Sequence, residues 1–265
     1  MQKLANDQLL NLDGKAAVVT GGGNGIGEGI AIRLAQAGAK VVVADIDLEA
    51  AKKVAQGLTV NGLTAKAVQV DVSDEAQVQA MIAACQDSYG AVDIVVNNAG
   101  IFPMIPVVSM THEQFQKVLN INLSSVFLSI KYASEIMKQQ ESGTIINVTS
   151  IDSLHPSMVG LAAYDASKHG AWGFTKNAAL ELSEFNIRVN AVAPGGVATP
   201  GVSKMSEGAS DEQKRAGNEA QMAKIPMHRM ADPDEIAKVV LFLASDMSSY
   251  MTGSQVVVDG GFLLK

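Results

Sequence analysis

A tyrosine and a lysine lie four residues apart in the stretch TSIDSLHPSMVGLAAYDASKHG, residues 149–170. Residues four apart on a helix share one face, so the Tyr164 phenol and the Lys168 ammonium can point into a common pocket. A phenol has an ordinary pKa of about 10, and a nearby positive charge favours its ionised form. The two residues therefore have the chemistry of a proton-transfer centre. The alternative is an ordinary Tyr and Lys on an amphipathic helix, and the stretch alone does not distinguish the two.

A glycine-rich turn follows the first expected strand in VVTGGGNGIGEGIAIRL and opens the first expected helix. Glycine permits positive φ and a close approach of the backbone, and a free helix N-terminus attracts phosphate. Such a turn alone is weak evidence, but its place between a strand and a helix favours a dinucleotide pyrophosphate site. The residues that we expect to form it are Gly21, Asn24, Gly25, Ile26 and Gly27.

An acid, Asp45, ends the second expected strand, 24 residues after Gly21. A carboxylate there can accept hydrogen bonds from both ribose hydroxyls and would repel a 2′-phosphate. Neither the glycine-rich loop nor Ile46, which follows the acid, offers a cation to that phosphate. The sequence therefore favours NAD over NADP, although an Asp at this place can also cap the turn before the next helix.

Two more strand ends are candidates for the edge of the cofactor site. Asp71, in VDVSD, is placed to meet the adenine amino group, and NNAG (97–100) changes abruptly from apolar to polar. Both patterns also occur in ordinary turns and helix caps.

Short β-branched runs alternate with amphipathic segments along the whole chain. The strands are expected at 15–20, 40–45, 66–71, 92–97, 143–149, 187–192 and 254–259, and the helices at 25–37, 48–57, 74–89, 111–139, 161–185 and 233–245. The strand centres are apolar without alternation, which is typical of parallel strands covered on both faces. We therefore predict one α/β domain over residues 1–265, a doubly wound, seven-stranded parallel sheet with helices on both faces.

Residues 198–229 interrupt this alternation with a polar segment rich in Gly and Ser. Long segments of this kind in compact domains are usually functional or disordered, and we predict a substrate-binding loop or lid. The segment FPMIP (102–106) is a second expected pocket edge, and Met104, Met158 and Met205 are candidates for apolar walls.

Four motifs, TGGGNGIG, NNAG, YDASK and PGGVATP, occur in that order. Together they closely resemble the short-chain dehydrogenase/reductase family, from about Leu12 to Phe262. The resemblance implies a Rossmann-type domain that uses NAD(P) to oxidise an alcohol or reduce a carbonyl. Transferred by position, it implies Asn122, Tyr164 and Lys168 as catalytic residues, with Asn120 the less favoured asparagine. It implies cofactor contacts by Asp71, Val72, Asn98, Gly100, Tyr164, Lys168, Pro194, Gly195, Val197 and Thr199.

The catalytic serine of the family usually precedes the Tyr by 13 residues, but Ile151 occupies that position here. Ser150 ends the fifth expected strand, where active residues of such sheets lie, and we favour it. Ser153 remains an alternative, or a substrate contact.

The resemblance implies that Tyr164 is the general acid/base, that Lys168 lowers its pKa and binds the nicotinamide ribose, and that Asn122 orients a water. Ser150 would hold the substrate oxygen, and Ser150, Ser153, His155 and Tyr164 are the expected substrate contacts. We expect an NAD-dependent dehydrogenase of a secondary alcohol, and a sugar or polyol is the expected substrate. The alternatives are a 3-oxoacyl thioester reductase and a non-catalytic NAD-sensing protein, which would have a damaged catalytic set.

Composition narrows the class of protein. The 265 residues are 48% hydrophobic and carry a net charge of −7, which argues against a general nucleic-acid binder. No long apolar run or signal-like segment is present, so we expect a cytoplasmic protein with no membrane partner. The single Cys85 and four scattered His predict no metal site. The long helices expected at 111–139 and 161–185 resemble those that family members use to form tetramers, so a homotetramer or homodimer is expected.

Overall fold

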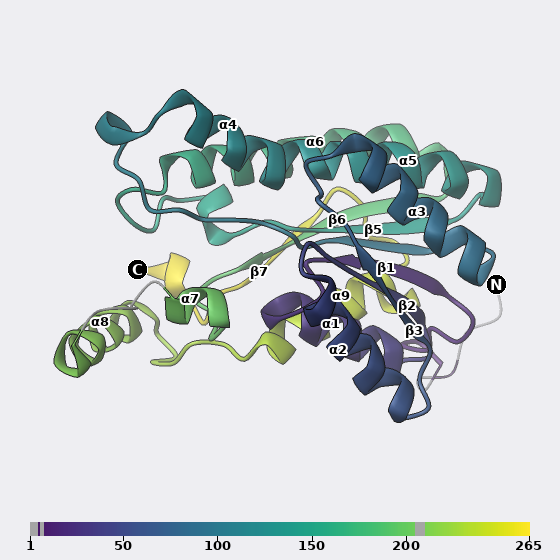
Figure 1. Cartoon of the computed structure of the whole chain (residues 1–265), viewed down its shortest axis with the longest axis horizontal. Coiled ribbons are helices and arrows are strands. Elements are labelled where there is room, and N and C mark those ends of the chain that lie inside the picture. The colour runs from purple at the N-terminus through teal and green to yellow at the C-terminus, as the bar shows by residue number, and fades with distance from the viewer. Residues whose placement is uncertain (1–4, 6–7, 205–209) are drawn as a thin grey trace.

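The computed structural model describes residue 5 and residues 8–204 and 210–265. Its centre is a parallel sheet of seven strands in the order β3-β2-β1-β4-β5-β6-β7 (Figure 1). The strands are β1 (Ala16–Thr20), β2 (Lys40–Asp45), β3 (Ala65–Gln69), β4 (Ile94–Asn97), β5 (Gly143–Val148), β6 (Ile187–Pro194) and β7 (Gln255–Val258). The strand order reverses between β1 and β4, and ligands of such sheets bind in the crevice at that point. The predicted fold class and all seven strands are confirmed.

Helices cover both faces of the sheet (Figure 1). One face carries α1 (Gly25–Gln36), α2 (Leu48–Val60) and α9 (Pro233–Ala244), and the other carries α3 (Glu75–Tyr89), α4 (His112–Leu119), α5 (Ser125–Gln140) and α6 (Ala162–Leu182). Two apolar cores result, one around Ile30 and Leu34 and the other around Met81 and Ile145. Because the central strands are buried on both faces, their side chains are continuously apolar, as the sequence pattern indicates.

The segment 111–139 is not the single helix that its pattern predicts. A π-helical turn over Asn120–Ser124 separates α4 from α5. The amide of Asn122, in the middle of this turn, is only 1% exposed and hydrogen-bonds the backbone of Ile101. Single π-helical turns inside helices often occur at functional sites, because the extra residue redirects a side chain. Here the turn directs Asn122 inwards.

The segment 198–229 is largely helical rather than irregular, which corrects the expected loop. It contains α7 (Pro200–Lys204) and α8 (Asp211–Lys224), which both lie towards the left side of the molecule in Figure 1. The α8 sequence is rich in Ala, Gln, Glu and Lys, all strong helix formers, and this propensity outweighs its polar character. Met205 lies outside the described residues.

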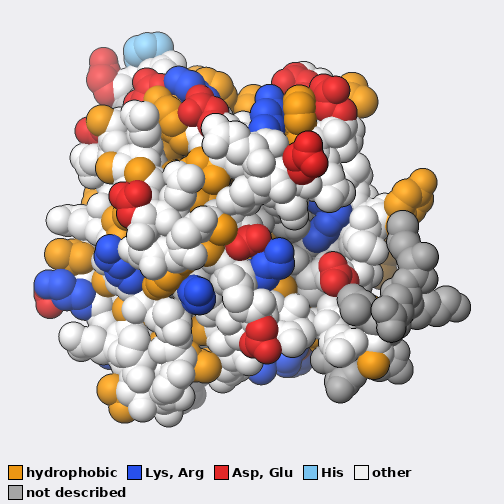
Figure 2. All heavy atoms as spheres, turned by 90° about the vertical axis from the view of Figure 1, so that its right-hand side faces the viewer, with side chains coloured by type: hydrophobic (Ala, Val, Ile, Leu, Met, Phe, Trp, Pro, Cys, Tyr) orange, Lys and Arg blue, Asp and Glu red, His pale blue; other side chains and the backbone are white. Residues whose placement is uncertain are grey.

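Charges of both signs are interspersed on the face shown in Figure 2, with no large area of one sign. None of the helices in the described part of the chain has both the length and the apolar character that a membrane crossing needs. The described residues also contain no group of three His, Cys, Asp or Glu side chains placed to hold a metal ion. Cys85 is buried beneath the sheet, and burial raises the pKa of its thiol to about 12.

Candidate active site

A cavity of about 840 Å³ opens at the carboxyl ends of the strands. Almost all of the predicted cofactor and catalytic residues line it. They are Gly21, Asn24, Gly25, Ile26, Asp45, Ile46, Asp71, Val72, Asn98, Gly100, Ser150, Tyr164, Lys168, Pro194, Gly195, Val197 and Thr199. The topology thus brings together residues that lie up to 178 positions apart, from Gly21 to Thr199.

The glycine-rich turn has the features of a phosphate cradle. Gly25 begins α1 with φ at +57°, a conformation that side chains disfavour, and it faces the cavity. A Cβ on Gly27 would overlap the carbonyl oxygen of Gly21, so this glycine lets α1 pack directly on the turn. The Asn98 amide donates to the carbonyl oxygens of Thr20 (3.0 Å) and Gly21 (3.1 Å) and holds the turn to the end of β4. The residues present therefore fit a dinucleotide pyrophosphate at the N-terminus of α1.

Asp45 is buried at the end of β2 and lines the same cavity. Its carboxylate accepts hydrogen bonds from the backbone N–H of Gly23 (2.9 Å) and of Asp47 (3.0 Å). The cap of α2 is a different residue, because Asp47 accepts from the N–H groups of Glu49 and Ala50. Asp45 therefore caps the turn that leads into α2, as considered from the sequence, and it also ties the glycine-rich turn to β2.

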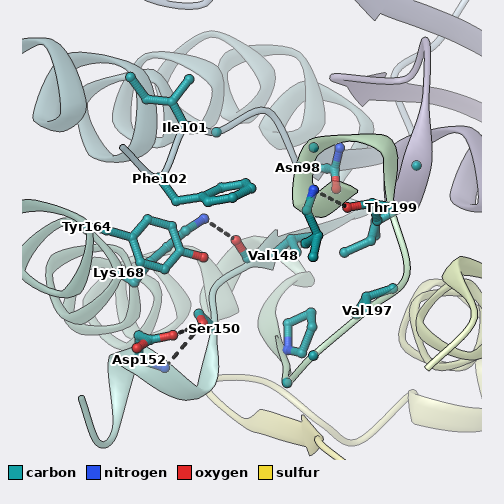
Figure 3. A pocket seen from close by; sticks show the side chains of 18 of the residues that line it. Asn98, Ile101, Phe102, Val148, Ser150, Asp152, Tyr164, Lys168, Val197 and Thr199 are labelled. Carbon is teal, nitrogen blue, oxygen red and sulfur yellow. Dashed lines mark hydrogen bonds between the residues drawn. The ribbon is translucent and has the colours of Figure 1, made fainter. Parts of the chain in front are cut away.

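Tyr164 and Lys168 lie one turn apart on α6 and face the cavity together (Figure 3). The Lys168 Nζ is 5.6 Å from the centre of the Tyr164 ring and donates a 2.8 Å hydrogen bond to the carbonyl oxygen of Val148. Only 5% of Lys168 is exposed, and burial lowers the pKa of its ammonium to about 8, against the opposing effect of Asp152. The predicted pairing of these two side chains in one pocket is thus present.

The pKa of Tyr164 departs from the expectation that Lys168 lowers it. Burial raises the pKa of the phenol well above its ordinary value, a hydrogen bond with Ser150 lowers it in part, and the charges of Asp152 and Asp165 raise it further. Desolvation of the phenolate outweighs the hydrogen bond, so the chain by itself holds Tyr164 protonated. In this form the phenol can donate a proton to a carbonyl oxygen.

The two candidate serines occupy different environments. Ser150 lines the cavity beside Tyr164, and its Oγ donates a 2.8 Å hydrogen bond to Asp152 Oδ2 (Figure 3). Ser153 is 2% exposed and does not line the cavity, because its hydroxyl is directed to the carbonyl oxygen of Ser150 (2.6 Å) and to Gln255 Oε1 (3.2 Å). Ser150 thus lies in the cavity beside Tyr164, whereas Ser153 is buried in hydrogen bonds behind it.

His155 does not line the cavity, contrary to the tentative expectation. It is exposed, and its Nδ1 lies 2.9 Å from the carbonyl oxygen of Pro156, the next residue. The loop after Ser153 turns the ring outwards and instead directs Ser157 and Met158 towards the cavity.

Asn122 lies behind the cavity wall rather than in it. Its Nδ2 donates to the Ile101 carbonyl oxygen (2.8 Å) and the Ser167 hydroxyl (3.0 Å), and its Oδ1 accepts from the Ile101 N–H (2.8 Å). Both amide hydrogens are therefore used within the protein. The side chain fixes the backbone just before Phe102, whose ring packs edge to face against Tyr164 at 6.1 Å.

One site residue, Asp152, escaped sequence reasoning. It is 5% exposed, lines the cavity and accepts a hydrogen bond from Ser150. The available signal was an acid two residues after the strand-end serine. Phe102 belongs to the segment FPMIP, which was expected to form a pocket edge, and it lines the cavity and contacts the Tyr164 ring.

The walls of the cavity beyond Tyr164 are mostly apolar. They come from the 101–104 segment, the 157–161 loop, α7 and the end of α8, and include Phe102, Met104, Ile151, Met158, Leu161, Val202, Ile225 and Met230. Residues of α8 such as Gly217 and Gln221 also line it. The 198–229 segment therefore forms part of this wall.

Comparison with known proteins agrees with this geometry. Residues 21–263 match a family model described as enoyl-(acyl carrier protein) reductase. The chain is 41% identical over 263 residues to the short chain dehydrogenase/reductase astE of Aspergillus oryzae, covering 98% of each chain. It is 38% identical to the 3-oxoacyl-(acyl-carrier-protein) reductase FabG of Thermotoga maritima, covering 96% of this chain and 100% of that one. It is 36% identical to the cyclohexanol dehydrogenase of an Acinetobacter strain, covering 100% of both.

A solved structure of an oxidoreductase is also similar to this chain. The crystal structure of levodione reductase matches with a TM-score of 0.88 at 38% identity, covering 94% of this chain and 97% of that one.

Proposed function

The chain belongs to the short-chain dehydrogenase/reductase family, and on this basis we propose that it is an NAD-dependent oxidoreductase that interconverts an uncharged, largely apolar secondary alcohol and its ketone. Tyr164 is the proposed general acid/base. Oxidoreduction of alcohols and carbonyls is common to the named relatives, whereas the cofactor, the substrate and the role of Tyr164 are the proposal.

The glycine-rich turn, Asp45 and Asp71 would hold the adenine nucleotide end of a nicotinamide cofactor, and Val197 and Thr199 would hold its nicotinamide end. When bound, the cofactor supplies the hydride acceptor or donor. The buried carboxylate of Asp45 supports NAD, because a 2′-phosphate brought to this position would meet a negative charge and the apolar Ile46.

The side chains of the chain supply the proton and the orientation. In the reducing direction the Tyr164 hydroxyl donates its proton to the substrate carbonyl oxygen, and in the oxidising direction the phenolate removes it from the alcohol. Ser150, next to Tyr164 in the cavity, orients the substrate oxygen. The Lys168 ammonium, fixed by Val148, provides a positive charge that stabilises the phenolate while it exists.

The apolar wall around Tyr164 is the observation that carries the substrate class. A sugar or polyol would need hydrogen-bonding side chains in the pocket, and Ser153 and His155 were the candidates. Ser153 is buried in structural hydrogen bonds, and His155 is outside the cavity. A polyol would meet a few polar side chains, among them Ser157, Gln221 and Lys224, but its other hydroxyls would face the apolar walls without partners, which costs binding energy. Two relatives, named for cyclohexanol and levodione, are consistent with a cyclic substrate.

The test is formation of NADH by the purified protein with matched substrates. Cyclohexanol and related cyclic secondary alcohols should be oxidised with a kcat/KM at least about 100-fold above that of sorbitol, glucose or gluconate. The same rates measured with NADP in place of NAD test the cofactor. Equal or higher turnover of the polyols would contradict the proposed substrate class while leaving the oxidoreductase assignment intact.

A 3-oxoacyl thioester reductase is the second candidate, favoured by the whole-length likeness to FabG and by the family model description. An apolar wall also suits an acyl chain. Acetoacetyl thioester reduction with NADH and NADPH distinguishes the two candidates, since turnover of the thioester well above that of cyclic ketones would favour the second.

We also propose a homo-oligomer. Phe127 on α5 and Leu180 on α6 are 45% and 75% exposed, so both apolar side chains lie on the surface of the long helices rather than in the core. Phe174 packs edge to face against Phe127. Light scattering of the wild type and of Leu180→Glu tests this surface, and identical masses equal to one chain would contradict it.

A further inference from the structure

An apolar strip continues outwards from the mouth of the cavity, and the proposed reaction does not use it. Its members belong to two segments, one between β4 and α4 and the other between β5 and α6. They are Met104 (50% exposed), Val107 (71%), Val108 (96%), Met158 (39%) and Val159 (88%), and we call them the outer strip. Single exposed apolar side chains are common on proteins, whereas contiguous groups of them mark binding surfaces.

The two segments are joined at one point. The backbone N–H of Ile105 donates a 2.9 Å hydrogen bond to the carbonyl oxygen of Gly160. Gly160 has φ at +92°, and a Cβ there would lie 3.3 Å from the Ile105 nitrogen, so the glycine permits this close approach. Every member of the outer strip lies within three residues of this hydrogen bond along the chain. The joined segments therefore present one apolar surface rather than two separate ones.

The outer strip is continuous with the wall of the cavity. Met104 and Met158 belong to both, because each lines the cavity and is also partly exposed. Phe102, two residues before Met104, and Leu161, three residues after Met158, line the cavity as well. The Phe102 ring packs against the ring of Tyr164 (Figure 3). An apolar path therefore runs from the side chain that is proposed to transfer the proton to the outside of the molecule.

The composition of the two segments indicates what can lie on the outer strip. Neither 101–110 nor 156–161 contains a charged residue. Valine offers no hydrogen-bonding group and methionine only a weak sulfur acceptor, so the strip binds solely by removing apolar surface from water. Methionine side chains are also flexible and adapt to ligands of different shape. Such a surface suits an aliphatic chain and offers nothing to a sugar or a charged group.

The size of the outer strip favours a small occupant over a second protein. Each partner in a standard protein interface contributes about 800 Å² of surface. Five side chains supply only a part of that area, since the two methionines are already half covered or more. A ligand whose reacting end occupies the cavity needs no such area, because the cavity supplies its remaining contacts.

We propose that the outer strip binds an unbranched aliphatic arm of the substrate while the reacting carbon lies at Tyr164. The proposal rests on the proposed function in one respect, namely that the reacting group binds beside Tyr164 and Ser150. It narrows the substrate class to a secondary alcohol, or its ketone, that carries a flexible alkyl chain. A second copy of this protein is the competing occupant of the strip.

The first test varies the length of the arm. Cyclohexanols with a 4-methyl, 4-propyl or 4-hexyl group share one reacting ring and differ only in the attached chain. A methylene that lies on a surface leaves water on one side only, so we expect kcat/KM to rise about twofold per methylene, or about 30-fold from methyl to hexyl. A kcat/KM that stays level or falls along the series would overturn the proposal.

A double variant, Val108→Asp with Val159→Asp, links this gain to the outer strip. Both side chains are exposed, so the fold should persist, and the added carboxylates keep water on the strip. We expect the ratio of hexyl to methyl kcat/KM to fall to about fivefold or less. Val60→Asp is the matched control, because it makes the same change at an 86% exposed valine at the end of α2 and should leave the ratio unchanged.

The double variant also tests the competing occupant. A ratio equal to that of Val60→Asp would overturn the proposal. If light scattering then showed a smaller assembly for the double variant alone, the outer strip would be a contact between copies of this chain.

Binding without turnover separates this proposal from the proposed function. Calorimetry measures the Kd of 4-methylcyclohexanone and 4-hexylcyclohexanone for the wild type and the double variant, with no reduced cofactor present. We expect the hexyl ketone to bind the wild type about 30-fold more tightly, and most of this advantage to be lost in the double variant. This pattern in a protein that oxidises no alcohol would refute the oxidoreductase proposal and support the strip. Equal Kd values for the two ketones would overturn the strip even in an active enzyme.

Discussion

Lys168 is fixed against the Tyr164 ring by the last carbonyl group of β5, since its Nζ donates a 2.8 Å hydrogen bond to the Val148 oxygen and lies 5.6 Å from the ring centre. A strand end and a helix face thus define the position of the ammonium before any ligand arrives. Such positioning is useful in catalysis, because the charge need not reorganise when the proton moves.

The buried ammonium has a consequence for stability. Burial lowers the pKa of Lys168 to about 8, so between that value and the ordinary lysine pKa the unfolded chain binds a proton that the folded chain has released. The free energy of unfolding must rise with pH in this window. From about pH 8 to about pH 9, we expect the wild type to gain about 1 kcal/mol relative to Lys168→Met. Urea unfolding at both pH values measures this, and parallel curves for the two proteins would contradict it.

Asp45 should set the choice of cofactor. Its carboxylate is buried at the end of β2, and a 2′-phosphate there would suffer like-charge repulsion worth several kcal/mol. We expect a preference for NAD over NADP on the order of 100-fold in kcat/KM, reduced at least tenfold in Asp45→Ser combined with Ile46→Arg. Asp47→Ser is the control, because serine also caps a helix and α2 should persist. A wild type that uses both cofactors equally would refute the role of Asp45.

The two serines should differ in effect. Ser150→Ala removes the hydroxyl beside Tyr164, and we expect a loss in kcat on the order of 100-fold with an intact fold. Ser153→Ala removes bonds to the Ser150 carbonyl oxygen and Gln255, so we expect a loss of about 1 kcal/mol in stability and a kcat within a few fold of the wild type. Steady-state kinetics and urea unfolding of both variants separate the roles. The reverse pattern would make Ser153 the catalytic serine.

Asn122 should matter for structure as well as activity. Asn122→Ala leaves the N–H and carbonyl groups of Ile101 and the Ser167 hydroxyl without their partner, which should cost about 3 kcal/mol of stability. Asn120→Ala changes an exposed residue of the same π-helical turn and should cost less than about 0.5 kcal/mol. Urea unfolding compares the two. Equal losses would show that the turn itself, and not the Asn122 amide, is the sensitive feature.

The strands and most of the residues that line the cavity could be predicted from the sequence because local chemistry marks them. A strand buried on both faces is continuously apolar, and it ends where Asp45, Asn98 and Ser150 introduce polar groups. A glycine such as Gly25 is needed for positive φ at any such turn. Each of these requirements concerns only a few neighbouring residues, so it leaves a recognisable pattern in the sequence.

The remaining features depend on contacts between distant segments. Asn122 is directed inwards by a π-helical turn, and its amide then hydrogen-bonds the backbone of Ile101, 21 residues earlier. Ser153 is withdrawn from the cavity by Gln255, 102 residues later. Hydroxyl or carboxyl type alone does not indicate which of these side chains faces the cavity.

The central claim is that the Tyr164 hydroxyl transfers the substrate proton, and Tyr164→Phe tests it most directly. The change removes one oxygen and keeps the ring that packs against Phe102. With a cyclic secondary alcohol that the wild type oxidises, we expect NADH formation to fall about 1,000-fold or more while NADH still binds, as followed by fluorescence. Turnover within tenfold of the wild type would contradict this claim and would mean that another group transfers the substrate proton.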